Sequence, residues 1–493
     1  MPVKLFNTLS GKLEVFQPQD GQQVRMYACG PTVYDYGHIG NFRTFVALDI
    51  LRRFLRQSGY KLQDVMNITD VDDKIIRKAA EQGVGVRQYA EKFEEAFLED
   101  STILSLQPPQ RLVRATDHVQ KMAEFIADLE KNGYAYRTED GSYYFRIAKF
   151  PEYGKLSKKD FAGMEVGARV DVDEYEKDNA RDFALWKSPK PGEAQWQTSI
   201  GPGRPGWHIE CSVMATEYLG ETLDLHAGGE DLIFPHHENE IAQSEARSGK
   251  PFARHWFHVR FLLVEGEKMS KSLGNFYTLR DLIVLGHKPS SIRYLLASVP
   301  YHRQLNFTFD GLKQAAASVE RLRNFKARLE REHFPEGAEP SISALAQETE
   351  AKMRAAMEDD LNTAEALGAI FEMLRQANTA ADAGKVGKGN VRELLSVLTR
   401  FDEVFEVIAD HDAEKLQIAA ESLRAAGKEL PPSLLQTEAA GQISDAHIEE
   451  LLTERASAKR ARDFPRADGI RQKLAEAGVI LEDTKDGVRW KRR

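Results

Sequence analysis

Two cysteines, a histidine and a glutamate are the residues of this sequence whose types best suit a metal ion. His236 and Glu240 are four residues apart, and Pro235 suits the first turn of a helix, where its missing N–H group costs nothing. In such a helix the side chains of His236 and Glu240 share one face. Cys211 lies on a separate segment, as mixed zinc ligands often do, and the other cysteine is Cys29. This spacing predicts a metal site.

Simpler interpretations of the same residues remain open. Free cysteine is among the most buried residue types, so Cys29 and Cys211 could be small core residues. A lone histidine such as His236 is more often a hydrogen-bonded core residue than a metal ligand. Residue type alone therefore leaves a metal site and an ordinary core as alternatives.

A second chemical feature is a glycine-rich turn at residues 30–41. A short apolar run at 25–29 precedes it, apolar residues follow at helical spacing over 42–55, and a second strand is predicted at 62–68. Strand, glycine-rich turn, helix and strand form the βαβ unit of a nucleotide-binding fold. The turn would present backbone N–H groups and the positive end of the helix to a phosphate.

A third feature is the segment Lys268-Met269-Ser270-Lys271-Ser272 with glycines on both sides. Lysines and serines between glycines are typical of a mobile loop that can neutralise polyphosphate charge, although a plain surface loop is the alternative. The C-terminal residues 455–493 are basic, with 12 Lys/Arg against 6 Asp/Glu, whereas the whole chain has a net charge of −9. This tail could bind RNA or could be a solvated charged helix.

The composition is that of a globular protein of several domains. The chain has 493 residues, 42% of them hydrophobic and 29% charged, which is too long for a single core. No apolar run approaches the ~18 residues of a membrane span, and the N-terminus lacks a signal-peptide core. Two cysteines argue against a disulfide framework. We expect a cytoplasmic protein with no membrane partner.

The order of these features predicts an α/β fold. It has a Rossmann-type nucleotide-binding catalytic domain that is split by an insertion, then an α-helical bundle and a small mixed α/β C-terminal module. After the insertion the sheet is expected to resume with strands at 223–226 and 259–264. The predicted units are a first catalytic half at 1–112, an inserted domain at 113–202, a second catalytic half at 203–260, a loop-bearing region at 261–316, a helical bundle at 317–425 and a basic module at 445–493.

Taken together, residues 29–44, 204–214, 226–243 and 268–274 resemble the cysteinyl-tRNA synthetases, a family of class I aminoacyl-tRNA synthetases. His38-Ile39-Gly40-Asn41 is similar to the class signature HIGH, and Lys268 to Ser272 matches the signature KMSKS letter for letter. Asn41 departs from the signature. Its amide donates hydrogen bonds as a neutral imidazole does, but it cannot become positively charged.

The resemblance implies a reaction and its partners. L-cysteine would react with ATP to give cysteinyl adenylate and pyrophosphate, and cysteine would then pass to the 3′-terminal ribose of tRNA(Cys). One Zn²⁺ per chain and Mg²⁺ with ATP are implied. The region at 261–316, which contains the KMSKS loop, would contact the tRNA stem, and a monomer is expected. The implied site residues are Cys29, Cys211, His236 and Glu240 for the metal; His38, Asn41, Lys268 and Lys271 for catalysis; Gly30, Thr32, His38, Gly40, Asn41 and Lys271 for ATP; Thr69, Trp207 and His226 for cysteine; Phe464, Asp468, Asp483 and Trp490 for the anticodon.

The need for zinc follows from the substrate. A hydrophobic pocket separates a thiol from a hydroxyl of similar shape only weakly. Zinc prefers thiolate and lowers the pKa of a thiol, so it would select cysteine over serine. Two alternatives stay open: an ATP-dependent cysteine:amino-sugar ligase of the mycothiol type, which would lack the basic tail, and a non-catalytic zinc-stabilised RNA-binding protein, which the lysine loop disfavours.

Overall fold

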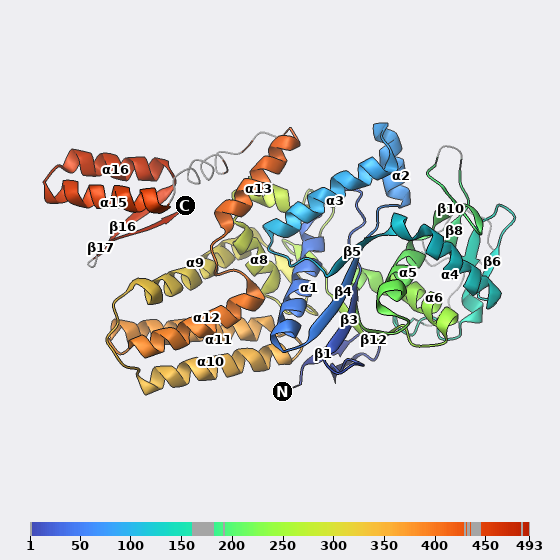
Figure 1. Cartoon of the computed structure of the whole chain (residues 1–493), viewed down its shortest axis with the longest axis horizontal. Coiled ribbons are helices and arrows are strands. Elements are labelled where there is room, and N and C mark those ends of the chain that lie inside the picture. The colour runs from blue at the N-terminus through green and yellow to red at the C-terminus, as the bar shows by residue number, and fades with distance from the viewer. Residues whose placement is uncertain are drawn as a thin grey trace.

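A five-stranded parallel sheet forms the centre of the computed structural model (Figure 1). The structure describes residues 2–159, 182–190, 193–427, 430, 434, 445–484 and 487–492. The strand order is β12-β11-β3-β4-β5, and every neighbouring pair is parallel. The strands are β3 (Gln23–Ala28), β4 (Lys61–Ile68), β5 (Arg111–Arg114), β11 (Leu223–Gly229) and β12 (Ala253–Val259). The predicted split Rossmann-type fold is thus confirmed.

Side chains of β3 alternate between two cores because successive residues of a strand point to opposite faces. Met26 and Ala28 pack with α1 (Ile39–Gln57) in one hydrophobic cluster. Tyr27, and Cys29 just beyond the strand, pack in another cluster with α5 (Trp207–Leu219). Each face of the sheet is therefore covered by helix, which is why β11 is buried at every position.

The predicted strand at 259–264 is wrong. Its first residue ends β12, and its last three form β13 (Leu262–Val264), which belongs to a separate three-stranded sheet with β14 (Glu267–Lys268) and β15 (Leu305–Phe307). Phe261, between β12 and β13, is 47% exposed. The apolar pattern did not indicate that the strand is interrupted here, with one side chain exposed to solvent.

The insertion forms its own five-stranded sheet, in the order β6-β7-β8-β10-β9. Its elements are α4 (Val119–Lys131), β6 (Ala135–Arg137), β7 (Tyr143–Phe145), β8 (Phe183–Lys187), β9 (Trp196–Thr198) and β10 (Gly201–Pro205). Because β5 still pairs with β4, and β10 pairs with β8, the insertion begins and ends slightly later than the predicted 113–202. Residues 160–181 and 191–192 of the predicted insertion lie outside the described residues.

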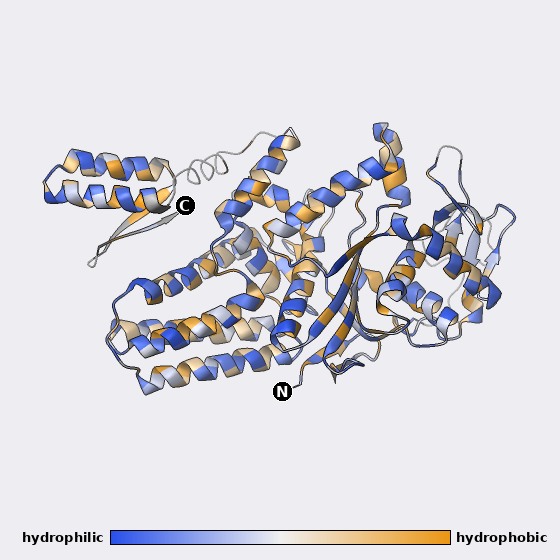
Figure 2. Cartoon of the chain, in the orientation of Figure 1, coloured by the Kyte–Doolittle hydropathy of each residue, from blue (hydrophilic) through white to orange (hydrophobic). Residues whose placement is uncertain are grey.

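Helices make up most of the chain between β14 and residue 425, and they contain both hydrophilic and hydrophobic residues (Figure 2). The first are α7 (Leu279–Val284) and α8 (Pro289–Ala297), and the bundle comprises α9 (Phe309–Arg331), α10 (Pro340–Glu358), α11 (Thr363–Asp382), α12 (Lys388–Phe405) and α13 (Asp412–Ala425). Buried Leu322, Phe325 and Leu329 form the predicted apolar stripe of α9. The predicted boundary at 316/317 falls inside α9, which begins after the cap residue Thr308.

A small C-terminal module completes the chain. It contains α15 (Asp445–Arg460), α16 (Phe464–Glu476) and an antiparallel hairpin of β16 (Val479–Thr484) and β17 (Gly487–Arg492) around a hydrophobic cluster of its own. Most of the preceding segment, 428–444, lies outside the described residues. The remaining elements are β1 (Lys4–Asn7), β2 (Lys12–Val15), α2 (Asp73–Gln82), α3 (Val86–Ile103) and α6 (Glu238–Ser248). In the described parts of the chain, no helix has the length and apolar character needed to cross a membrane.

Candidate active site

The site lies at the carboxyl ends of β3 and β11, where the strand order reverses. The chain leaves β3 toward β4 on one side, whereas β11 pairs with β3 on the other side. Cys29 is the residue after β3, and its N–H donates to the carbonyl of Ala227 on β11 at 3.0 Å. Open α/β sheets bind ligands at such a reversal because the outgoing connections part there and leave a crevice.

Four predicted ligands meet at this point. Cys29 Sγ is 3.8 Å from Cys211 Sγ and 3.7 Å from Glu240 Oε1, and His236 Nε2 is 3.0 Å from the same Glu240 oxygen. The ligand atoms of all four residues lie within 4.8 Å of one another, and all four residues are buried. The sulfur separation is too long for a disulfide, but it matches the ~3.8 Å between two thiolates that bind one tetrahedral ion at ~2.3 Å. The residues therefore fit a metal ion of the size of zinc.

The helix that contains Glu240 begins later than the sequence predicts. Residues 233–237 form a single π-helical turn in which Phe234 has extended dihedral angles, and the Phe234–Pro235 peptide bond is cis. Pro235 is thus not in the first turn of α6, which starts at Glu238. His236 and Glu240 nevertheless approach each other, because the π-helical turn leads directly into α6.

The charges of the cluster suit a cation. Burial alone would raise the pKa of Glu240, but His226 and His236 lower it to about 2. Burial alone would lower the pKa of His236, but Glu240 and Cys211 raise it to about 10. Burial alone would raise the pKa of Cys211, but a hydrogen bond from the Cys29 thiol lowers it to about 6. At neutral pH the cluster without an ion therefore contains a carboxylate, a thiolate and a protonated His236. Binding of a metal ion would release the proton of His236, because a metal binds neutral imidazole.

His226, predicted to bind cysteine, lies behind Glu240. Its Nε2 is 2.8 Å from Glu240 Oε2, and its ring stacks on Trp256 with 4.5 Å between ring centroids. The side chain is fully buried. These contacts orient a predicted metal ligand, and a direct contact of His226 with the substrate stays a prediction.

Three further histidines, which the sequence prediction did not assign, border the ligands. His237 Nε2 is 3.3 Å from Cys29 Sγ, and its Nδ1 is 2.8 Å from His258 Nε2. His208 Nδ1 is 2.9 Å from His236 Nδ1. A second set of ligand atoms that all lie within 4.8 Å of one another consists of Cys29, His226, His237 and Glu240. The adjacent histidines 236–237 could have indicated a second histidine at the site, but the sequence does not show that both side chains are buried.

Trp207 and Thr69, the other residues predicted for the cysteine pocket, contact His236 and Glu210, respectively. The Trp207 ring stacks on His236 with 4.2 Å between centroids and keeps 38% of its surface exposed. Thr69 is buried and donates its hydroxyl to Glu210 at 3.2 Å. Burial, together with Cys211, raises the pKa of Glu210 well above its usual range. Trp207 is thus partly open to solvent, Thr69 is a buried polar group, and a contact of either residue with cysteine stays a prediction.

The predicted phosphate turn runs beside this pocket. Thr32 forms a bridge with Thr69, which ties the turn to the end of β4. At Gly30 a Cβ atom would lie 1.7 Å from the carbonyl oxygen of Asn67, so only glycine fits. At Gly40 a Cβ atom would approach the side chains of His38 and of Met269 in the lysine loop. The glycines thus permit close approach of the turn to its neighbours, and ATP binding by them stays a prediction.

His38 and Asn41 cap α1. His38 Nδ1 accepts from the Asn41 N–H, and Asn41 Oδ1 accepts from the His38 N–H, both at 3.1 Å. This reciprocal pair satisfies two backbone donors at the helix start. Burial, with a smaller contribution from Lys271, lowers the pKa of His38 to about 4, so the imidazole is neutral at pH 7. The first turn of α1 is therefore ordered, with the Asn41 N–H paired to His38, and binding of a phosphate there stays a prediction.

The cap leads to a test of Asn41. Asn41→Ala is expected to lose about 1 kcal/mol of unfolding free energy, measured by urea denaturation, because the His38 N–H loses its acceptor. Asn41→Asp keeps an acceptor and should keep the stability. If the Asn41 amide also donates to ATP, Asn41→Asp should lower the turnover of ATP. Equal stability of the wild type and Asn41→Ala would contradict the capping role.

Lys271 in the loop is close to the phosphate turn. Its Nζ is 3.0 Å from Asp35 Oδ2, and Lys78 from α2 contacts the same oxygen at 3.1 Å. Burial alone would raise the pKa of Asp35, but the two lysines lower it. Lys268 is exposed in β14. Because the Lys271 side chain is 67% exposed, its ion pair contributes little stability, and a phosphate could replace Asp35 as its partner.

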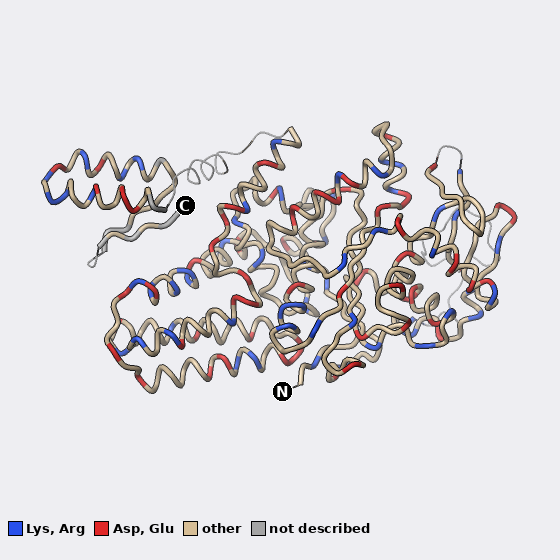
Figure 3. The backbone as a smooth tube through the Cα atoms, viewed as in Figure 1, with Lys and Arg blue, Asp and Glu red and all other residues tan. Residues whose placement is uncertain are grey.

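The predicted anticodon residues all lie in the C-terminal module. Phe464 is 59% exposed at the start of α16, and Asp468 is exposed one turn later. Asp483 lies in β16, and Trp490 in β17 donates its ring N–H to Glu449 at 2.7 Å. Lys and Arg are spread along α15 and α16 and alternate with acidic residues (Figure 3). Phe464 and Asp468 are therefore accessible to a partner, whereas the Trp490 N–H already has one.

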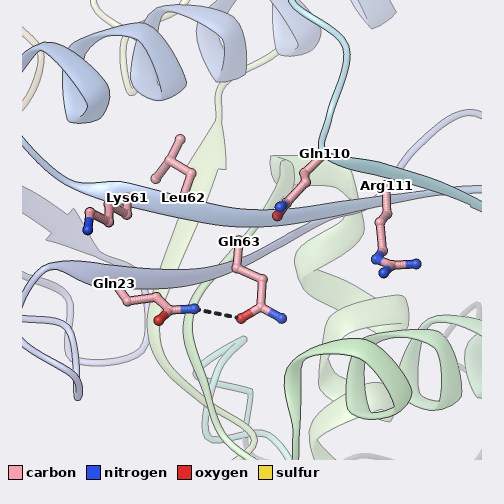
Figure 4. A pocket seen from close by; sticks show the side chains of 6 residues that line it. All are labelled: Gln23, Lys61, Leu62, Gln63, Gln110 and Arg111. Carbon is pink, nitrogen blue, oxygen red and sulfur yellow. Dashed lines mark hydrogen bonds between the residues drawn. The ribbon is translucent and has the colours of Figure 1, made fainter.

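A surface pocket of about 430 Å³ lies away from this site (Figure 4). It is lined by Gln23, Lys61, Leu62, Gln63, Gln110 and Arg111. These residues are at or next to the amino ends of β3, β4 and β5, whereas the metal ligands follow the carboxyl ends of the strands. No predicted site residue lines this pocket.

Comparison with known proteins places the fold in a class. Residues 15–317 match the family profile "tRNA synthetases class I (C) catalytic domain". A solved structure of Mycobacterium tuberculosis methionyl-tRNA synthetase in complex with methionyl-adenylate superposes with a TM-score of 0.57 at 17% identity, over 83% of this chain and 94% of that chain. The architecture is thus that of the class I aminoacyl-tRNA synthetases.

Full-length relatives narrow the class to one family. A cysteine–tRNA ligase of Koribacter versatilis is 63% identical, and one of Solibacter usitatus is 55% identical, each over 100% of both chains. The profiles "DALR domain" and "Cysteinyl-tRNA ligase anticodon binding domain" match residues 352–430 and 444–490. The chain belongs to the cysteine–tRNA ligase family, and neither the amino-sugar ligase nor the non-catalytic RNA-binding protein is favoured.

Proposed function

We propose that this chain activates L-cysteine with ATP, releases pyrophosphate and transfers cysteine from the adenylate to the terminal ribose of tRNA(Cys). The single observation behind this proposal is the junction of two half-sites at one strand reversal. The buried ligands Cys29, Cys211, His236 and Glu240 form one half, and the capped start of α1 with the lysine loop forms the other. Full-length family membership supports the same reaction.

One Zn²⁺ held by Cys29, Cys211, His236 and Glu240 would bind the thiolate of the substrate and so select cysteine against serine. Around that thiolate, Trp207 excludes water from one side, since its ring covers His236. Thr69 and Glu210 offer buried polar groups on the other side. In this arrangement the carboxylate of cysteine would have to point toward the phosphate turn, which follows Cys29 directly in the chain.

ATP, which Mg²⁺ accompanies, would bind across His38 with its phosphates at the start of α1. The carboxylate of cysteine attacks the α-phosphorus, and pyrophosphate departs. Lys271 and Lys268 neutralise the charge that develops on the leaving group, and no enzyme nucleophile is needed. Positioning and electrostatics therefore account for the chemistry of this step.

Cysteine-dependent exchange of pyrophosphate into ATP tests the activation step directly. The purified chain should contain about one zinc ion and should show exchange with cysteine but not with serine. A zinc-loaded protein that shows no exchange would refute the proposal. Transfer is tested separately by charging of tRNA(Cys).

The C-terminal module gives a third prediction. Removal of residues 445–493 should leave exchange within about twofold, because the module has its own hydrophobic core, and should lower kcat/KM for tRNA charging by about 100-fold. Phe464→Ala should reproduce part of this loss through lost base stacking. Phe261→Ala removes another exposed phenylalanine, 47% exposed against 59% for Phe464, from the body of the protein and serves as the control. Unchanged charging by the shortened chain would refute an RNA-binding role of the module.

A further inference from the structure

Arg280 in α7 is a buried charged residue whose hydrogen-bond partners lie on other helices. Its side chain is 7% exposed. Its Nε donates to Asp100 Oδ1 at 2.9 Å, and one terminal nitrogen donates to Glu99 Oε2 at 2.7 Å and to the Ala96 carbonyl at 3.3 Å. All three acceptors lie on α3. A buried guanidinium is tolerated when it is fully paired in this way.

Two further contacts of Arg280 reach other parts of the chain. Its second terminal nitrogen donates to the hydroxyl of Ser422 on α13 at 2.5 Å, and that hydroxyl donates to Glu99 at 2.6 Å. The guanidinium also lies over the ring of Tyr36, 4.8 Å from the ring centroid. Tyr36 belongs to the phosphate turn, two residues before the cap residue His38. One side chain thus joins α3, α7, α13 and the turn.

The position of α7 matters because α7 is bound to the ATP half of the site. The Ile39 N–H at the start of α1 donates to the carbonyl of Tyr277 at 3.0 Å. His38 forms a bridge with Thr278, the cap residue of α7. The lysine loop ends only a few residues before Thr278. A displacement of α7 would therefore move both the cap of α1 and the loop that contains Lys271.

The other end of the connection is α13, the last helix before the segment that leads to the C-terminal module. Asp412, at its start, accepts from Ser290 of α8 at 2.9 Å and from Arg323 of α9 at 2.7 Å. Ser422, near its end, contacts Arg280. Helix α13 is thus held to the bundle at one end and to α7 at the other.

We propose that Arg280 is a positioning residue that keeps the ATP half of the active site, at Tyr36 and the lysine loop, in register with α13. The proposal rests on the proposed function, because it concerns how ATP is placed for activation of cysteine. Arginine suits this task since its planar fork donates in several fixed directions while its plane stacks on an aromatic ring, whereas a lysine ammonium is a single point charge without that plane. Arg280 does not contact the predicted metal ligands, so the cysteine half should not depend on it.

Arg280→Lys tests whether Arg280 affects the ATP half of the site and not the cysteine half. The variant keeps the charge beside Asp100 and Glu99 but loses the fork and the ring contact. In cysteine-dependent exchange, KM for ATP should rise about fivefold or more and kcat should fall, since small misplacements of reacting groups are costly. KM for cysteine and the zinc content should stay as in the wild type.

Arg293→Lys is the matched control. Arg293 is also a buried arginine between domains, and it donates to Asp49 at 2.5 Å, to the Leu104 carbonyl at 2.9 Å and to the Phe405 carbonyl at 2.7 Å. It contacts neither the turn nor the lysine loop in these bonds. If Arg293→Lys produces the same selective rise in KM for ATP, or if Arg280→Lys raises the KM values for ATP and cysteine equally, the proposal is overturned.

Ser422→Ala isolates the contact with α13 and is mild enough to fold. It removes one hydroxyl on the bundle side and leaves Arg280, Asp100 and Tyr36 in place. A rise of about twofold in KM for ATP, with an unchanged KM for cysteine, is expected. An unchanged KM for ATP would overturn the role of α13. Absence of exchange in the wild type would instead refute the proposed function, so the two failures are distinguishable.

Discussion

Cys211→Ala is expected to abolish stoichiometric metal binding and to lower kcat/KM for cysteine-dependent exchange by more than about 10³-fold, because loss of an outer-shell partner alone costs 10–100-fold. The variant removes one of the two sulfur ligands, whose separation of 3.8 Å fits a shared ion. It also leaves Glu240 buried beside fewer partners. Metal analysis of the purified protein and the exchange assay measure the two effects separately.

Ser212→Ala is the control for that experiment. Ser212 is the next residue of α5 and is equally buried, and its hydroxyl donates to the Glu240 carbonyl oxygen at 3.5 Å. Its loss should leave metal content unchanged and exchange within about threefold, since the bond is long and weak. A Cys211→Ala protein that still holds one metal ion per chain and still depends on cysteine would show that Cys211 is a core residue.

Lys271→Ala is expected to lower kcat for exchange by about 10²–10³-fold, the usual cost of removing one group that stabilises charge developing in the transition state. The metal content and KM for cysteine should not change, because Lys271 lies on the phosphate side of the site. Lys313→Ala removes an exposed lysine with a similar surface ion pair, to Asp310, and should have no effect.

The contact between Lys271 and Asp35 allows a second explanation, that the lysine only holds the loop against the phosphate turn. Asp35→Asn separates the two explanations. If Lys271 acts on the phosphates, Asp35→Asn should retain exchange within about tenfold, since an exposed ion pair contributes at most about 1 kcal/mol. If Asp35→Asn lowers exchange as much as Lys271→Ala does, the role of Lys271 is to anchor the loop.

The two half-sites differ in how far sequence could predict them. The phosphate turn is local: strand, glycines and helix follow one another within about 45 residues, so the βαβ unit could be predicted from patterns of period two and 3.6. The end of β12 could not be predicted, because the apolar pattern does not indicate that the strand is interrupted at the exposed Phe261. The start of α6 was also misplaced, since the turn at 233–237 has no distinct residue pattern.

Contacts between distant segments account for what sequence missed. His237 contacts Cys29, and His258 of β12 contacts His237 because β12 is adjacent to β11 in the sheet. Likewise, Arg280 is an unremarkable arginine in the sequence, and its role follows from the meeting of α3, α7 and α13 around it. Residue types limit the chemistry that is available, but tertiary packing decides which side chains meet at one site.

By itself the sequence predicted the fold class and the strand–turn–helix unit, because both depend on residue type and local spacing, and the resemblance to a known family supplied the set of four candidate ligands. Only the tertiary structure decided that Cys29 and Cys211, 182 residues apart, face each other at 3.8 Å. The physical reason is the pairing of β3 with β11, which places Cys29, at the end of β3, beside the end of β11. Helices α5 and α6 bring Cys211 and Glu240 to the same place. The same reversal joins the proposed cysteine half of the site to the proposed ATP half.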